Sequence, residues 1–598
     1  MKAKKDAQVV KNKPKTTPAL PIFAALSALF GSGAIIGLTL FSDPANTLKV
    51  AWALAIPYAV CFIVLFLLIW AYGSIYPPLV YVSLPVATLA CGARTAYTSF
   101  FNPLAVALIF ILLCAATLIA CLWALHRYPM PAKKPAKSWV NSTFAILGLC
   151  VAAALSLCLF ITVFQGRLDW LQTDRTPQAE IGQMLYYMQH SGQAFTTLIA
   201  HAPQSYFATQ FAPLWYLLLP VYALFDHSML AVGIALYALM LSALIPLWRI
   251  CRKLSLSYMQ TAALGIALAC SPLLIGGGSV GGTLGMLSLP LLLWVADALL
   301  GKRPYLALIP LILCLGIGFE VTLWTAFICF YLAMSVRCEN RRAGLVCTAV
   351  AVIGLIATTV YLIIVQSPVI SNLFASIGIQ FGKKLLFWVL LALPFALLPL
   401  FSGQKWALVL LVPYTLFHLV ANASVFSGVF CTYAYPVIAA MAILSAHGTA
   451  KLHTEIKGIA LAKLLPALAV CAAIVLSMPY ASVLAQLYVP KVEAETETEQ
   501  EQAQLPEHEF MHKILAQLPQ NASITASDTL LCALHDRTWL FSLSRDPAHP
   551  QTNVIVLDLR EDFIPSDMES YDVAYYQSLG YTLRDDLSRE GILAVLFK

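Results

Sequence analysis

About fifteen long apolar stretches fill roughly the first 490 residues, whereas roughly the last 110 residues contain none. A helix crosses the hydrocarbon layer with about 20 apolar residues, and stretches of that length recur here. Soluble helices keep a polar face, which these stretches lack. The pattern therefore predicts an α-helical polytopic membrane protein with about 15 transmembrane helices. Clear examples are residues 51–70, 103–125, 144–164, 229–250, 345–365 and 465–487.

The C-terminal region has a different pattern, in which short strand-like and helix-like segments alternate. Helices are expected at 508–517, 528–535 and 572–579, and strands at 523–526, 539–543, 553–557, 581–584 and 592–597. Such alternation predicts a small α/β domain.

These patterns divide the chain into consecutive parts. A basic tail (1–17) precedes an N-terminal four-helix membrane unit (18–125) and a basic, proline-rich linker (126–138). A second membrane domain (139–488) contains a long loop at 165–212. The apolar run 213–225 within it is too short for a span and is expected not to cross. An acidic linker (489–504) leads to the soluble domain (505–598).

The distribution of charge predicts the orientation. The chain has 598 residues, of which 60% are hydrophobic and 11% charged, with a net charge of +7. Of the 36 Lys and Arg residues, 22 lie in the N-terminal tail and the loops of one side, and six lie in the opposite loops. The positive-inside rule places the N-terminus in the cytoplasm, and an odd number of spans places the C-terminal domain and the 165–212 loop outside. The basic residues are thus topology signals, and no nucleic-acid partner is expected. The predicted location is the inner or plasma membrane.

Candidate chemistry concentrates in the long outer loop. Asp169, Asp174 and Glu180 could act as a general base or bind a divalent cation, although most loop acids are simply solvated. Arg175, His201 and Gln210 of the same loop are the candidates for contacts with a substrate.

Three further positions stand out because charge is costly in a membrane. Glu320 lies at the turn of an apolar hairpin, where it is either functional or an acid that reaches into water. Lys383 and Lys384 are expected in an outer loop, where they either hold a lipid phosphate or extend to the interface. Asp297 is expected to form an ion pair at a helix end near Lys302 and Arg303.

Three stretches carry a resemblance to a known family. They are AEIGQMLYYMQHSGQAF with its continuation to residue 254, GFEVTLWTAFICFYLA at 318–333, and LPQNASITASDTLLCALHDRTWLFSL at 518–543 followed by VIVLDLR. Together they resemble domain-of-unknown-function family 2079, over roughly residues 140–598. That family is similar to the C-type (GT-C) glycosyltransferases, multi-span enzymes that use polyprenyl-phosphate sugars at the outer face.

The resemblance implies positions for acidic residues, and this chain keeps some and changes others. Glu180 and Glu320 occupy acidic positions of the family. Leu185, Gln210 and Phe319 stand where the family carries an acid, a His and a Lys, respectively. The leading hypothesis is a glycosyltransferase that acts on a polyprenyl-phosphate sugar. The alternatives are a non-catalytic envelope scaffold or binding protein, and a transporter.

Overall fold

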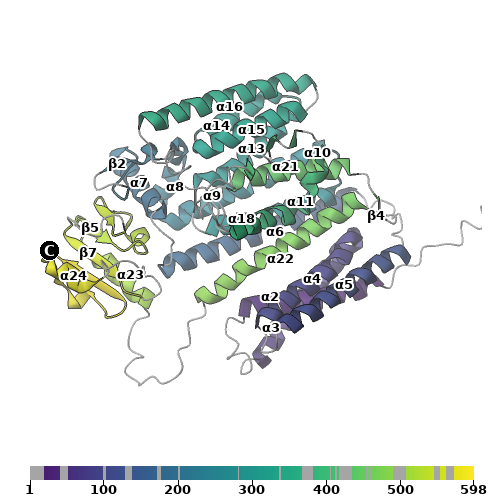
Figure 1. Cartoon of the computed structure of the whole chain (residues 1–598), viewed down its shortest axis with the longest axis horizontal. Helices are drawn as coiled ribbons and strands as arrows, with labels where there is room; N and C mark the ends of the chain where they lie inside the picture. Colours follow the sequence, from purple (N-terminus) through teal and green to yellow (C-terminus); the bar gives the residue numbers. More distant parts are fainter. Residues whose placement is uncertain are drawn as a thin grey trace, which may run out of the picture.

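The computed structural model is mostly helical, with a sheet near the C-terminus (Figure 1). It describes residues 19–40, 51–98, 103–127, 138–171, 177–199, 203–209, 211–279, 282–335, 338–365, 381–403, 406–407, 409–410, 414–415, 434–452, 455–456, 459–488, 507–544, 552–560 and 572–598. Among these residues, four helices are long and apolar enough to cross a membrane: Trp139–Asp169, Met229–Lys253, Tyr258–Gly277 and Asn340–Ile364. The predicted number of about 15 spans is therefore not confirmed.

The N-terminal unit consists of four apolar helices: α2 (Ala19–Leu40), α3 (Ala51–Ile75), α4 (Pro77–Thr98) and α5 (Pro103–Arg127). Figure 1 shows them as a separate bundle beside the long helix α22 (Leu461–Tyr488). Tyr81 and Leu84 of α4 are buried against Cys121 and Ala124 of α5. The outward faces of these four helices carry exposed apolar side chains such as Leu112 and Ile119, as expected of helices that face lipid.

The second membrane domain is built around one large apolar core. Its helices are α6 (Ser138–Asp169), α8 (Leu219–Leu224), α9 (Met229–Leu241), α10 (Leu244–Lys253), α11 (Tyr258–Ala269), α12 (Pro272–Ser279), α13 (Ser288–Leu299), α14 (Leu308–Leu315), α15 (Phe319–Ser335), α16 (Cys338–Ile364), α18 (Phe381–Ala392), α21 (Tyr435–Lys451) and α22. Short 3₁₀ segments connect several of them: η2 (Pro213–Leu217), η3 (Leu284–Leu287), η4 (Pro304–Ala307), η5 (Leu393–Phe395) and η6 (Leu398–Ser402). A two-stranded hairpin, β3 (Glu455–Ile456) and β4 (Ile459–Ala460), precedes α22.

Proline and serine residues set several of the boundaries. The apolar run 213–225 forms η2 and then α8 rather than one helix, and each segment has a proline at its start. Helix α9 begins after Ser228, whose hydroxyl accepts a hydrogen bond from the Ala231 amide. Helix α11 begins with a capping box formed by Ser257 and Gln260.

The C-terminal region forms a mixed five-stranded sheet in the order β6-β5-β7-β9-β8. The elements are α23 (Glu507–Gln517), β5 (Ile524–Ala526), η8 (Leu531–Leu534), β6 (Leu540–Ser542), β7 (Val554–Asp558), α24 (Val573–Ser578), β8 (Thr582–Leu583), η11 (Asp585–Leu587) and β9 (Leu593–Phe597). Strand β5 pairs in parallel with β6 and β7, and β9 pairs antiparallel with β7 and β8. The predicted strands are confirmed, but the helix expected at 528–535 is wrong, since its residues form turns and the short η8.

Both faces of this sheet are covered. Val554 and Val556 point into one core, which also contains residues of α23, whereas Ile555 and Leu557 point into a second core with Tyr576 of α24. The alternation follows from the two-residue period of a strand. Leu171, Ala179 and Leu198, from the long segment 165–212, belong to the first core. The sheet therefore completes its core with residues that lie more than 300 positions earlier in the chain.

Candidate functional site

Helix α7 (Pro177–Ser191), which carries the predicted site residue Glu180, stands between the membrane domain and the C-terminal sheet (Figure 1). Met184 and Leu185 point into the membrane-domain core, while Ala179 points into the core of the C-terminal sheet. A short helix with two apolar faces can be stable only when both are covered. Helix α7 is thus held from both sides.

Gln183 is the polar centre of this junction and is fully buried. Its amide nitrogen donates to Thr197 Oγ1 (2.9 Å) and to the Arg537 carbonyl oxygen (3.1 Å). Its amide oxygen accepts from Thr196 Oγ1 (2.7 Å) and from the Thr197 backbone N–H (2.9 Å). One side chain therefore ties α7 both to the hairpin of β1 (Phe195–Thr196) and β2 (Gln204–Ser205) and to the C-terminal region.

Arg537, whose backbone carbonyl oxygen accepts from Gln183, also has a buried side chain. Its guanidinium is buried and donates to the carbonyl oxygens of Pro519 (2.5 Å) and Leu518 (3.1 Å). These carbonyls follow the C-terminal end of α23, where backbone acceptors lack partners within the helix. Burial lowers the pKa of Arg537, but the carbonyl bonds compensate the buried charge. Tyr187 adds a second link, because its hydroxyl donates to the Thr538 carbonyl oxygen at 2.6 Å.

His535 packs closely against Gly182 of α7. A Cβ atom placed on Gly182 would lie 2.6 Å from His535 Cδ2, so only glycine allows this approach. The two ring nitrogens of His535 face the carbonyl oxygens of Cys532 (2.6 Å) and His227 (3.0 Å). The ring therefore connects η8 to the turn before α9 as well.

A second junction lies at the end of α6. Asp558 is buried and receives two bonds from the side chain of Arg560, from Nε at 2.9 Å and from Nη2 at 2.6 Å. Arg560 also donates to the carbonyl oxygens of Trp170 (3.0 Å) and Leu171 (3.2 Å). The C-terminal sheet is therefore attached to one end of the membrane domain at two places.

The structure describes four of the predicted site residues. Glu180 lies in the first turn of α7 and is partly buried, as the helical pattern predicted. Asp169 is exposed and is the last residue of α6, so its assignment to the loop is wrong because α6 extends beyond the apolar run. Its carbonyl oxygen lies 2.9 Å from Nε2 of His512.

Glu320 lies in the first turn of α15 and is partly buried. Lys384 is 3% exposed within α18, so the expectation of a lysine in an outer loop is wrong, because the helix begins at Phe381. Asp174, Arg175, His201, Gln210 and the side chain of Lys383 lie outside the described residues. Among the described residues, no group of three His, Cys, Asp or Glu side chains could hold a metal ion.

A cavity of about 560 Å³ lies elsewhere, between α10, α13 and η4–α14. Neither Glu180 nor Glu320 lines it. Asp297, at its wall, pairs with Arg249 (2.9 Å) and Lys253 (2.7 Å). The expected pairing with Lys302 and Arg303 is therefore wrong, since the neighbouring helix α10 supplies the partners. The sequence showed each of these charges but not that they surround a cavity.

Comparison with known proteins gives a family and two similar structures. Residues 357–578 match a family described as "Predicted membrane protein (DUF2079)". No curated protein matches the sequence. Two crystal structures of ArnT from Cupriavidus metallidurans are similar to this chain, each over 75% of this chain and 97% of ArnT. The structure bound to undecaprenyl phosphate has 12% identity and a TM-score of 0.48, and the apo structure has 13% and 0.47.

The family match confirms the resemblance for its C-terminal part, because it includes the stretch at 518–560. The stretches at 179–254 and 318–333 lie outside the matched residues. The matched residues begin in the membrane helix α16 and end in α24 of the C-terminal region. The match therefore includes part of the membrane domain and most of the C-terminal region. This chain is a membrane protein whose residues 357–578 match the DUF2079 family.

Proposed function

We propose that the chain is a glycosyltransferase that acts at the outer face of the membrane on a polyprenyl-phosphate sugar. The observation that carries the proposal is the position of Glu180. It lies on a helix that is fixed by the membrane core on one side and by the Gln183 network on the other. A catalytic carboxylate must be held in one geometry to be effective, and α7 provides such a support. The acidic family position that the sequence resemblance assigns to Glu180 points the same way.

In this proposal Glu180 deprotonates the acceptor hydroxyl or binds a divalent cation. As a residue of the first helical turn, it lies where backbone N–H groups favour a negative charge. Asp169 and Asp174 are the candidates to assist it, and Glu320 is a second candidate carboxylate on α15. Lys383 and Lys384 would engage the phosphate of the donor. Arg175, His201 and Gln210 remain candidates for contacts with the sugar or the acceptor.

The test is Glu180→Gln, which keeps the size of the side chain and removes its charge. Glu509→Gln is the matched control, because Glu509 also lies in the first turn of a helix in the predicted outer region and is exposed. Transfer of labelled sugar from the polyprenyl phosphate to envelope material should fall about 10²- to 10⁴-fold for Glu180→Gln and stay unchanged for Glu509→Gln. Loss of transfer upon chelation of divalent cations would assign Glu180 to a cation, and survival of transfer would assign it to the base. Full turnover by Glu180→Gln would exclude Glu180 from the mechanism.

A second candidate function is a non-catalytic binding protein of the cell envelope. It is favoured by the two junctions, which use buried Gln183, Arg537 and Asp558 to mount the C-terminal sheet rigidly at the end of the membrane domain. Such a protein would retain binding of envelope polymers in Glu180→Gln and show no transfer in the parent. Cosedimentation of vesicles containing the full chain with purified envelope polymers separates this function from the transferase.

A further inference from the structure

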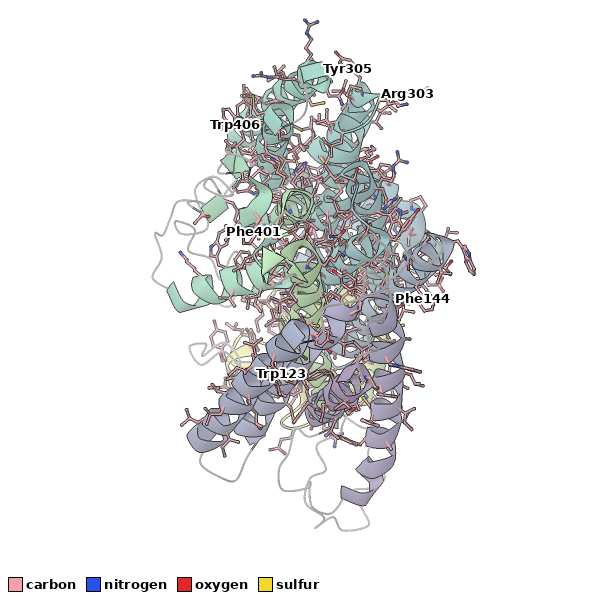
Figure 2. The ribbon with its side chains drawn as sticks, turned by 90° about the vertical axis from the view of Figure 1, so that its right-hand side faces the viewer. Trp123, Phe144, Arg303, Tyr305, Phe401 and Trp406 are labelled. Carbon is pink, nitrogen blue, oxygen red and sulfur yellow. The ribbon has the colours of Figure 1, made fainter. Side chains whose placement is uncertain are left out.

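The cavity between α10, α13 and η4–α14 lies at the opposite end of the membrane domain from the C-terminal sheet. Figure 2 views the molecule from that end and shows Arg303 and Tyr305 together at its edge. By the distribution of Lys and Arg this is the cytoplasmic face. The cavity is therefore separate from the outer-face site proposed above, and nothing in that proposal uses it.

The charges around the cavity are strongly unbalanced. Arg249, Lys253, Lys302 and Arg303 line it together with a single carboxylate, Asp297, for a net charge of +3. Asp297 is 3% exposed and already engaged by Arg249 and Lys253. Lys302 and Arg303 are exposed and form no ion pair with any residue that the structure describes. The uncompensated positive charge of Lys302 and Arg303 would attract an anion into the cavity.

Two of the basic side chains are held in place. Arg249 donates from Nε to Asp297 while its guanidinium lies over the Trp294 ring, 5.2 Å from the centroid. Its terminal nitrogens form no hydrogen bond with any residue that the structure describes, and a guanidinium can donate from them in the fork geometry that suits phosphate oxygens. Lys253 donates to the Asp297 carbonyl oxygen at 2.5 Å. These contacts distinguish the cavity from a set of loose surface cations.

The C-terminal end of α13 faces this region, and its carbonyl groups would repel an anion. These carbonyl groups, however, already accept hydrogen bonds from side chains. Asn340 Nδ2 donates to the carbonyl oxygens of Leu299 (2.6 Å) and Gly301 (3.0 Å), and Lys253 occupies that of Asp297. The negative end of the helix is thus largely neutralised.

The remaining wall of the cavity is apolar and continues onto the outside of the molecule. Leu306 and Ile309 line the cavity and are 51% and 62% exposed, and Ile312 beside them is 60% exposed. In a membrane protein such a surface faces acyl chains. Tyr305, 57% exposed, directly precedes this apolar surface in the chain, and aromatic side chains are enriched at the headgroup level of membranes. A basic cavity that opens onto an apolar track fits a molecule with a phosphate at one end and a hydrocarbon chain at the other.

We propose that this cavity binds the phosphate headgroup of an anionic membrane lipid, with an acyl chain along Leu306, Ile309 and Ile312. The volume of about 560 Å³ is within the range of small-ligand sites. Anionic lipids are also concentrated in the cytoplasmic leaflet.

The experiment uses the full-length chain in detergent and counts bound phosphatidylglycerol by native mass spectrometry, with phosphatidylcholine as the neutral comparison. The test variant is Lys302→Gln with Arg303→Gln, which removes two exposed charges and keeps side-chain length. The control is Arg341→Gln with Arg342→Gln, two exposed residues at the start of α16 on the same predicted face. Because a basic residue near a lipid surface contributes about 1 kcal/mol, the test variant should bind phosphatidylglycerol about 30-fold more weakly. The control should change the affinity less than about 3-fold, because Arg341 and Arg342 do not line the cavity.

Three outcomes would overturn the proposal. Equal binding of phosphatidylcholine would show that the phosphate charge is not recognised. An equal loss in both double variants would reduce the effect to general surface charge. Competition by inorganic phosphate that displaces the lipid completely would assign the cavity to a soluble anion, because a lipid is held by its acyl chain as well. Arg249→Lys keeps the charge, loses the fork and serves as an independent variant, expected to weaken phosphatidylglycerol binding while leaving thermal stability near that of the parent.

Discussion

Replacement of Gln183 by alanine should loosen the C-terminal sheet from the membrane domain. The truncation removes the acceptor of two buried donors, the Thr196 hydroxyl and the Thr197 backbone N–H. It also removes the donor to the Arg537 carbonyl oxygen. Each buried group left without a partner costs about 1–3 kcal/mol, and water that enters the vacated space recovers part of this. A net cost of about 2–3 kcal/mol corresponds to a rise of about 30- to 150-fold in the open population.

Hydrogen exchange followed by mass spectrometry can measure this opening. The amide of Leu540, on the edge strand β6, donates to Thr197 Oγ1 at 3.3 Å and should exchange faster by that factor. Strand β9 lies on the other side of β7 and should keep its protection. Gln193→Ala is the control, since Gln193 is exposed in the same loop. Unchanged exchange at Leu540 in Gln183→Ala, or an equal increase in Gln193→Ala, would refute the assigned role of Gln183.

Three other predictions concern the same region. Gly182→Ala should destabilise the junction between α7 and the C-terminal region, because the new Cβ would lie within 2.6–2.9 Å of His535 atoms. The C-terminal region should then become more sensitive to protease. Normal protease resistance would show that His535 can move aside. A reporter active only outside the cytoplasm should be active when fused after Lys598, and a silent reporter together with an active cytoplasmic one would reverse the predicted orientation. Bonds from Arg584 to Asp586 hold the pKa of that carboxyl below its usual range, so their contribution to stability is present above the ordinary carboxyl pKa and is lost as the pH falls. In Arg584→Ala an NMR titration should return the Asp586 pKa to its usual range, and an unchanged pKa would exclude the pair.

The sequence by itself determined the properties that depend on local pattern. Apolar runs without polar faces identified a helical membrane protein, and the two-residue alternation of 553–557 and 592–597 located strands β7 and β9. The helical pattern around Glu180 gave α7 and its first turn correctly. Local pattern was insufficient at 528–535, where turns and η8 replace a helix, because Asp528 accepts a hydrogen bond from Ser542 of β6 and His535 packs against Gly182 of α7.

Only the tertiary structure decided which distant residues meet. Gln183 reads as an ordinary polar residue of an amphipathic helix, yet it is fully buried against a carbonyl 354 positions later. The partners of Asp297 lie on α10, 44 and 48 positions earlier, although Lys302 and Arg303 are closer in sequence. Sequence separation does not report distance in a folded chain, because helix packing brings together side chains that no periodicity relates. For the same reason the basic cavity is invisible in the sequence: its charges read as orientation signals until α10, α13 and η4–α14 enclose them.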